Sequence, residues 1–282
     1  MKKSELKVTN RLFIAIVSVV GISMLNSAGV IHGVQASEVN KQEMVTPATP
    51  KSMLSSSTSL QRQRDVLRHI DPLDAGRAMA SHRGKNPHSG LTPDQEIKVA
   101  LQHFQEGRKP EAMVSLGQAI SKYPNVAKLY DVRATLELQS GETSDALADL
   151  EKAVALAPEN PIYRVNRSQV YLKFHREKEA LDDLNKAVEL NPNLLPARFN
   201  RGSLLAYQGK NKEALADFDQ CIALSPHLPA PYFNRGAVHK ALGNNELAIK
   251  DMQNFIKIAN HDSWKKSAQD LLKVWQDEKG KH

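Results

Sequence analysis

The sequence predicts an all-α solenoid, because three residue registers recur at a spacing of 34 residues along more than half of the chain. An alanine keeps the first register five times, a glycine keeps the second four times, and a proline keeps the third four times. Packing around a single core does not require residues to recur at a fixed spacing, so stacked repeats are the expected architecture. The alanines are Ala112, Ala146, Ala180, Ala214 and Ala248, the glycines are Gly107, Gly141, Gly209 and Gly243, and the prolines are Pro124, Pro158, Pro192 and Pro226.

Each repeat is expected to hold two helices. Apolar and small residues recur at spacings of three and four on both sides of the central glycine, as in Leu147, Leu150 and Val154, and this spacing is typical of amphipathic helices. The glycine permits a left-handed backbone conformation where the two helices join, and the proline ends the second helix. Counted from Pro93, the five units are 93–126, 127–160, 161–194, 195–228 and 229–262.

A capping helix is expected after the fifth unit, followed by a short tail to residue 282. Residues 263–279 place one apolar face beside several charged residues, and Asp262 or Ser263 is the expected N-cap. Packing of that face on unit five would shield the last apolar surface of the stack, and the alternative is a dimer interface. The apolar face consists of Trp264, Ala268, Leu271, Leu272 and Trp275.

The residues before the repeats predict export. Basic residues precede an apolar run, and Val34, Gln35 and Ala36 form a small-x-small cleavage pattern, so residues 1–36 are expected to be a signal peptide cleaved after Ala36. The alternative is an uncleaved membrane anchor, since residues 12–34 are long enough to span a bilayer. The mature protein is expected to be periplasmic or secreted, or anchored in the inner membrane if cleavage fails.

Residues 37–92 are expected to be a disordered linker, because they are rich in Ser, Thr, Pro, Gly and His and poor in large apolar residues. A transient helix over 60–70 is expected within it, with a docking motif as the alternative.

The linker and the predicted signal peptide carry most of the excess positive charge, whereas residues 93–282 hold 26 basic and 25 acidic residues. The repeats therefore do not predict a nucleic-acid partner.

The chain has a single cysteine, Cys221, so no internal disulfide can form. Cys221 falls in a register that alanines occupy in units one to three, where two helices must approach closely. It is therefore interpreted as a small buried residue and not as a catalytic thiol. These alanines are Ala119, Ala153 and Ala187.

The five units resemble tetratricopeptide repeats. Residues 232–236 (YFNRG), 213–218 (EALADF) and 187–192 (AVELNP) are close to the consensus sequence of that family, and the unit length agrees with it. Departures occur at Lys98 in unit one, at His175 where glycine is usual, and at Phe255 and Asn260 in unit five. The resemblance implies a right-handed superhelical α-solenoid whose first helices line a concave groove.

The same resemblance implies that the groove binds an extended peptide or a segment of a partner protein. Asparagine recurs at the sixth position of units three to five, and a primary amide can both donate to and accept from a peptide backbone. The alternatives are that these asparagines are common helix-face residues of the family and that the phenylalanines beside them belong to the core. The predicted peptide-binding residues are Asn166, Asn200, Asn234, Phe199, Phe233, Gln169, Lys173 and Tyr207.

Arginines and aspartates also recur with the repeat and predict an internal ladder of ion pairs. An arginine guanidinium can make two parallel hydrogen bonds to a carboxylate, and such pairs would tie neighbouring helices together. Their role is interpreted as fixing the register of the helices and not as recognition of a ligand. The arginines are Arg133, Arg167, Arg201 and Arg235, and the aspartates are Asp149, Asp183, Asp217 and Asp251.

The sequence shows no motif of an enzyme. It has no phosphate-binding glycine loop, no His-Glu-x-x-His pair, no nucleophile elbow and no paired cysteines, so no cofactor and no metal site are expected. The expected function is that of an exported, non-enzymatic scaffold that binds a protein or peptide. The alternatives are an assembly factor anchored in the inner membrane, which would contact the membrane through its uncleaved N-terminus, and a catalytic module that uses the repeats to choose substrates.

Overall fold

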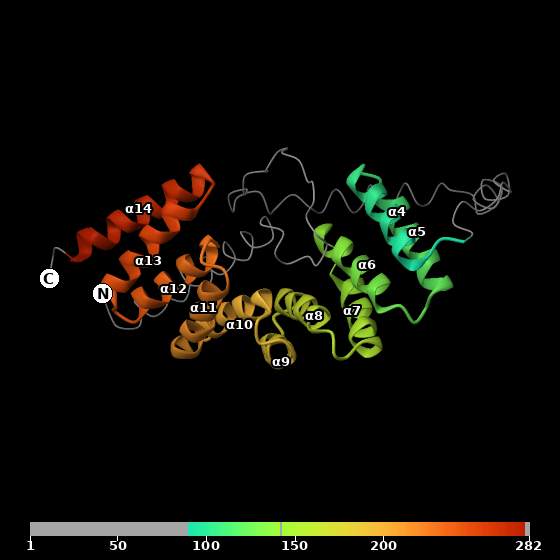
Figure 1. Ribbon diagram of the computed structural model, residues 1–282, viewed down its shortest axis with the longest axis horizontal. Helices are drawn as coiled ribbons and strands as arrows, with labels where there is room; N and C mark the ends of the chain where they lie inside the picture. The colour runs from blue at the N-terminus through green and yellow to red at the C-terminus, as the bar shows by residue number, and fades with distance from the viewer. Residues whose placement is uncertain (1–89, 142, 280–282) are drawn as a thin grey trace, which may run out of the picture. The chain divides into compact units, whose positions relative to one another are not determined.

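The computed structural model describes residues 90–141 and 143–279, and within these residues it contains eleven α-helices and no strand. The helices follow one another as antiparallel pairs in chain order (Figure 1). The first helices of the five units are α4 (Pro93–Gln105), α6 (Ala127–Gln139), α8 (Pro161–Lys173), α10 (Leu195–Tyr207) and α12 (Pro229–Ala241). The second helices are α5 (Lys109–Lys122), α7 (Ser144–Leu156), α9 (Glu177–Leu190), α11 (Asn211–Leu224) and α13 (Asn245–Ile258), and α14 (Asp262–Lys279) follows them.

The units are closer together on the side of the first helices. Each first helix packs against its own second helix and also contacts the first helix of the next unit. Among the described helices, no second helix contacts the second helix of the next unit. The first helices therefore form the inner side of the stack, and we call their combined surface the first-helix face.

The turn between the two helices of a unit requires a left-handed backbone. Gly107, Gly141, Gly209 and Gly243 all have φ between 76° and 81° at this turn, as the glycine register predicts. In unit three the same position is occupied by His175, whose φ is 57°, and it is the one non-glycine residue with positive φ in the described part of the chain. A side chain in this conformation costs about 1 kcal/mol, so the turn of unit three is strained relative to the others.

The alanine register lies at the closest approach of the helices. Ala112, Ala146, Ala180, Ala214 and Ala248 are all fully buried. A Cβ atom added to Gly236 of α12 would lie 3.3 Å from the carbonyl oxygen of Ala248, and one added to Gly202 of α10 would lie 3.1 Å from Cβ of Asp217. The first and second helices therefore approach too closely for larger residues. Small residues at these positions let the two helices of a unit pack directly on each other.

Cys221 is fully buried, and its register companions Ala119, Ala153 and Ala187 are buried as well. Burial raises the pKa of its thiol to about 12, and the nearby carboxylate of Asp217 contributes to the rise. Because the thiolate is the reactive form, this thiol is inert at neutral pH. The interpretation of Cys221 as a buried filler is confirmed.

The helix expected after unit five is α14. Ala268 and Trp275 are buried on the last unit, and Trp264, Leu271 and Leu272 are partly buried against the same core. Lys240 of α12 lies 5.8 Å from the centre of the Trp275 ring. The helix begins at Asp262, so the two predicted N-cap residues lie within its first turn. Its apolar face covers the last unit of the stack, which agrees with a capping role.

Several sequence predictions fall on residues outside the described ranges. They are the signal peptide over 1–36, the linker over 37–92 except its last three residues, and the short helix over 60–70. Within the described ranges, no helix has both the length and the apolar character that crossing a membrane would require.

Candidate binding face on the first helices

Three of the predicted binding residues are part of the interior. Phe199, Asn200 and Asn234 have exposed fractions of 0%, 2% and 3%, so the expectation of an exposed row of three carboxamides is wrong for the two asparagines. The ring of Phe199 packs against Phe218 with its centroid 5.9 Å away, and the open alternative that it is a core residue is the correct one. The physical reason differs between them: Phe199 packs against the second helix of its own unit, whereas Asn234 lies against the preceding first helix, where it bonds to Ser203.

Two of the asparagines instead bond toward the preceding unit. Asn166 Nδ2 donates to Asp131 Oδ1 on α6 at 2.7 Å, and Asn234 Nδ2 donates to Ser203 Oγ on α10 at 3.0 Å. These bonds join first helices of adjacent units across the face. The asparagine register therefore stabilises the spacing of the units, whatever else it contacts.

The bond between units is absent at Asn200. Neither Asn200 Nδ2 nor Asn200 Oδ1 has a hydrogen-bond partner in the described residues, although both atoms are buried. The Nε2 atom of Gln169, on the preceding first helix, is also buried without a partner among these residues. Each such group costs about 1–3 kcal/mol, so the boundary between units three and four carries unsatisfied polar groups on this face.

The remaining predicted residues keep accessible surface. Asn166, Gln169 and Phe233 are partly exposed, Lys173 is exposed, and Tyr207 is 41% exposed. Phe233 also packs on Phe255 with ring centroids 5.0 Å apart, which leaves part of its ring at the surface. The accessible polar and aromatic groups of the predicted set therefore lie on α8, α10 and α12.

Asp131 on α6 is a member of this face that the sequence analysis missed. It is partly exposed, and its Oδ1 accepts the bond from Asn166. Burial raises the pKa of its carboxyl group from 3.8 to about 6, and the bond from Asn166 opposes the rise. A signal was present in the sequence, because the same register holds Ile97, Val165, Phe199 and Phe233 in the other units, and Asp131 is its one charged member.

The predicted ladder of ion pairs is confirmed in units two to five. In each unit an arginine of the first helix donates two hydrogen bonds to an aspartate of the second helix, with N–O distances of 2.6–2.8 Å. The bonds to the aspartate raise the pKa of the arginine in every case. The pairs are Arg133–Asp149, Arg167–Asp183, Arg201–Asp217 and Arg235–Asp251.

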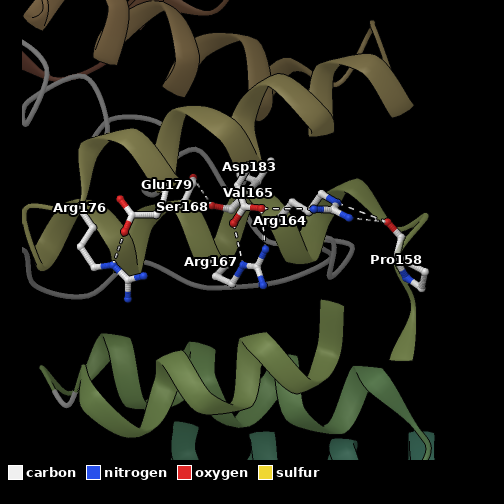
Figure 2. Close-up of polar contacts among 8 residues, drawn as sticks. All are labelled: Pro158, Arg164, Val165, Arg167, Ser168, Arg176, Glu179 and Asp183. Carbon is white, nitrogen blue, oxygen red and sulfur yellow. Dashed lines mark hydrogen bonds and ion pairs between the residues drawn. The ribbon is translucent and has the colours of Figure 1, made fainter. Parts of the chain in front are cut away.

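A second arginine joins the ladder in units three and four. Arg164 reaches Asp183 at 3.3 Å while its Nε and Nη2 donate to the carbonyl oxygen of Pro158, as Figure 2 shows for unit three. In unit four the corresponding Arg198 donates to Asp217 at 3.0 Å. Both carboxylate oxygens of Asp183 and of Asp217 thus accept bonds from arginines of their own unit, which supports a role in holding the two helices together.

Two of the ladder arginines also extend between units. Arg201 Nη1 donates to Asn185 on α9 at 3.3 Å, and Arg235 Nη1 donates to Asp219 on α11 at 2.6 Å. Each bond links a first helix to the second helix of the preceding unit.

The described residues contain no group of three or more side chains arranged to hold a metal ion.

Comparison with known proteins gives the same architecture. Family models for the tetratricopeptide repeat match residues 132–194 and 230–262, and a further TPR repeat model matches residues 202–243. The chain is 25% identical to YrrB, a TPR protein with an unusual peptide-binding site, over 62% of this chain and 90% of YrrB, with a TM-score of 0.52. A comparison with curated protein sequences found no match.

Two further solved structures share the fold at lower identity. PilF of Pseudomonas aeruginosa is 20% identical over 66% of this chain and 86% of PilF, with a TM-score of 0.58. TTC0263, a thermophilic TPR protein of Thermus thermophilus, is 19% identical over 66% of this chain and 99% of that protein, with a TM-score of 0.52. The similarity extends along most of each of these two proteins.

Proposed function

Because this chain is a tetratricopeptide repeat protein, we propose that it is a non-enzymatic scaffold that binds an extended segment of a partner protein along its first-helix face. The fold supports a protein-interaction role, and YrrB, which has the same architecture, carries a peptide-binding site. The site on this chain is proposed to run across α6, α8, α10 and α12.

The observation that carries this proposal is the set of accessible groups on neighbouring first helices. Asn166 is partly exposed and offers an amide group that can bond to a peptide backbone whatever its side chains are. Tyr207 offers an exposed ring, and aromatic residues contribute strongly at interfaces because they bury a large area at a low entropic cost. Lys173 offers a charge at the end of α8.

The test uses a phage-displayed library of random dodecapeptides selected on the wild-type protein. The first-helix variant combines Lys173→Glu with Tyr207→Ala. The matched control combines Lys178→Glu with Leu224→Ala on the second helices, since Leu224 and Tyr207 are both 41% exposed and Lys178 and Lys173 are both accessible to solvent. The affinity of the selected peptides is expected to fall about tenfold or more for the first-helix variant and to stay unchanged for the control.

Two results would contradict the proposal. One is the recovery of no peptide above the level obtained with an unrelated protein. The other is an equal change of affinity in both variants, which would place binding away from the first helices. Circular dichroism of each variant verifies that the array is folded, because all four side chains are accessible and none belongs to the buried core.

We also propose that the protein is exported and acts in the periplasm or outside the cell. The support is the basic and apolar leader with its small-x-small pattern at Val34–Ala36. N-terminal sequencing of the protein recovered from the envelope fraction of a bacterial host is expected to begin at Ser37. A protein that retains Met1 and sediments with membranes would instead support the anchored alternative.

A further inference from the structure

We infer that Asp131 selects a cationic side chain, lysine or arginine, in the partner segment. This inference deepens the proposed function and rests on it, because it assumes that a segment lies along the first-helix face. It assigns a chemical preference to one position of that segment. Its basis is the contrast between Asp131 and the other acidic residues that the fold buries.

The other buried acidic residues have cations close to them within the protein. Each of the four ladder aspartates is bonded to an arginine of its own unit, and Glu96 lies 3.6 Å from a lysine. Glu137 is near enough to Arg133 to raise the pKa of that arginine. Asp131 makes no ion pair with any described residue, and its one hydrogen bond comes from the neutral amide of Asn166. Its Oδ2 atom accepts no bond from the described residues and is therefore available to a ligand.

The surroundings of Asp131 supply no positive charge. The negative charge of Asp131 raises the pKa of Tyr163 on α8, although burial makes the larger contribution to that rise. Lys128 of α6 is paired with Asp94, Arg133 of α6 with Asp149, and Lys122 of α5 with Glu96. No described cation is among the groups that shift the pKa of Asp131. A cation that approaches from the face would therefore meet an anion with no competing partner.

The charge on Asp131 also has a cost in the free protein. Burial disfavours its ionised form, as the elevated pKa shows, so at neutral pH the fold carries a charge that it does not compensate. Residues that lower stability and lie on an accessible face are candidates for function, because stability and function often oppose each other at binding sites. A lysine or arginine from a partner would restore the compensation that each ladder aspartate already has.

The geometry of the array also limits where the cationic residue falls. Packed helices lie about 8–10 Å apart, and an extended peptide advances about 3.3 Å per residue. A segment that crosses from α6 to α10 passes two helix spacings, and Tyr207 also lies about 12 Å further along its helix than the register of Asp131. The residue over Tyr207 is therefore about six or seven positions from the residue at Asp131. A dodecapeptide is long enough to cover both positions.

The experiment repeats the dodecapeptide selection on full-length wild-type protein, Asp131→Asn, Asp131→Lys and the control Asp182→Asn. Asp182 is an accessible acid on α9, so the control makes the same change of charge away from the face. Wild type and Asp182→Asn are expected to enrich lysine or arginine at one fixed position of the peptides. Asp131→Asn is expected to lose that enrichment and to bind the wild-type peptides about tenfold more weakly, and Asp131→Lys is expected to enrich aspartate or glutamate there.

The possible failures are distinguishable. Peptides that carry no basic position and bind wild type and Asp131→Asn equally would overturn this inference and leave the proposed function standing. Enrichment of basic residues by all four proteins would also overturn it, since the preference would then come from another acid. Recovery of no specific peptide by wild type would overturn the proposed function and the inference together.

Discussion

Replacement of Asp217 by alanine is expected to lower the free energy of unfolding by about 3 kcal/mol. The carboxylate of Asp217 is almost completely buried and accepts hydrogen bonds from both Arg201 and Arg198. Its removal would leave two guanidinium groups, which are themselves only 17% and 21% exposed, without a counter-ion. The measurement is a urea denaturation curve followed by circular dichroism, read as a decrease in the midpoint.

The matched control for this variant is Asp219→Ala on the same helix. Asp219 also bonds to an arginine, Arg235, but its carboxylate is 58% exposed and Arg235 keeps its two bonds to Asp251. A change of about 0.5 kcal/mol or less is expected, because exposed pairs contribute little. Equal destabilisation by Asp217→Ala and Asp219→Ala would show that burial does not decide the strength of the ladder.

The variant Asp131→Asn is expected to be more stable than the wild type at pH 7.5, by about 2 kcal/mol. The pKa of Asp131 is raised in the folded protein from 3.8 to about 6, so the folded state holds a proton more tightly than the unfolded chain. Between these two values the stability of the wild type therefore falls as the pH rises, and the loss is complete above about pH 6. Asparagine avoids this loss and can still accept the bond from Asn166 through its amide oxygen.

The difference in stability between Asp131→Asn and wild type is the measured quantity, taken from urea denaturation at several pH values between about 4 and 8. This difference is expected to be near zero at about pH 4 and to increase as the pH rises to about 6. For Asp182→Asn, which changes an accessible acid, the difference in stability from the wild type is expected not to depend on pH in this range. A difference that does not depend on pH would mean that Asp131 is ionised as easily in the folded protein as in the unfolded chain.

The architecture could be predicted from the sequence because it depends on local and periodic features. The glycine and alanine registers specify a left-handed turn and a close helix contact in each unit, and both requirements are independent of the rest of the chain. The arginine–aspartate ladder could be predicted for a similar reason, since both partners repeat in phase. His175 shows that a single departure from the register leaves the turn in place at a local cost.

The candidate site could be predicted only in part, because exposure depends on contacts between units. Asn166 and Asn200 occupy the same register, yet Asn166 is partly exposed and bonded to Asp131 while Asn200 is buried without a partner among the described residues. In the preceding unit, Asp131 accepts a bond from Asn166, whereas the same register position before Asn200 is the apolar Val165, which has no side-chain acceptor. A register identifies which side of a helix a residue occupies, but the neighbour across the interface decides whether that residue is covered.

Contacts between units in this array join nearest neighbours, so the cooperativity of unfolding depends on each boundary in turn. A partner segment lying across α6, α8 and α10 would bridge two of these boundaries at once, including the one where Asn200 and Gln169 are unsatisfied. Units two to four would then melt as one block at a higher temperature than the ends of the stack. Binding of a partner would thus change the order in which the units unfold as well as their melting temperatures.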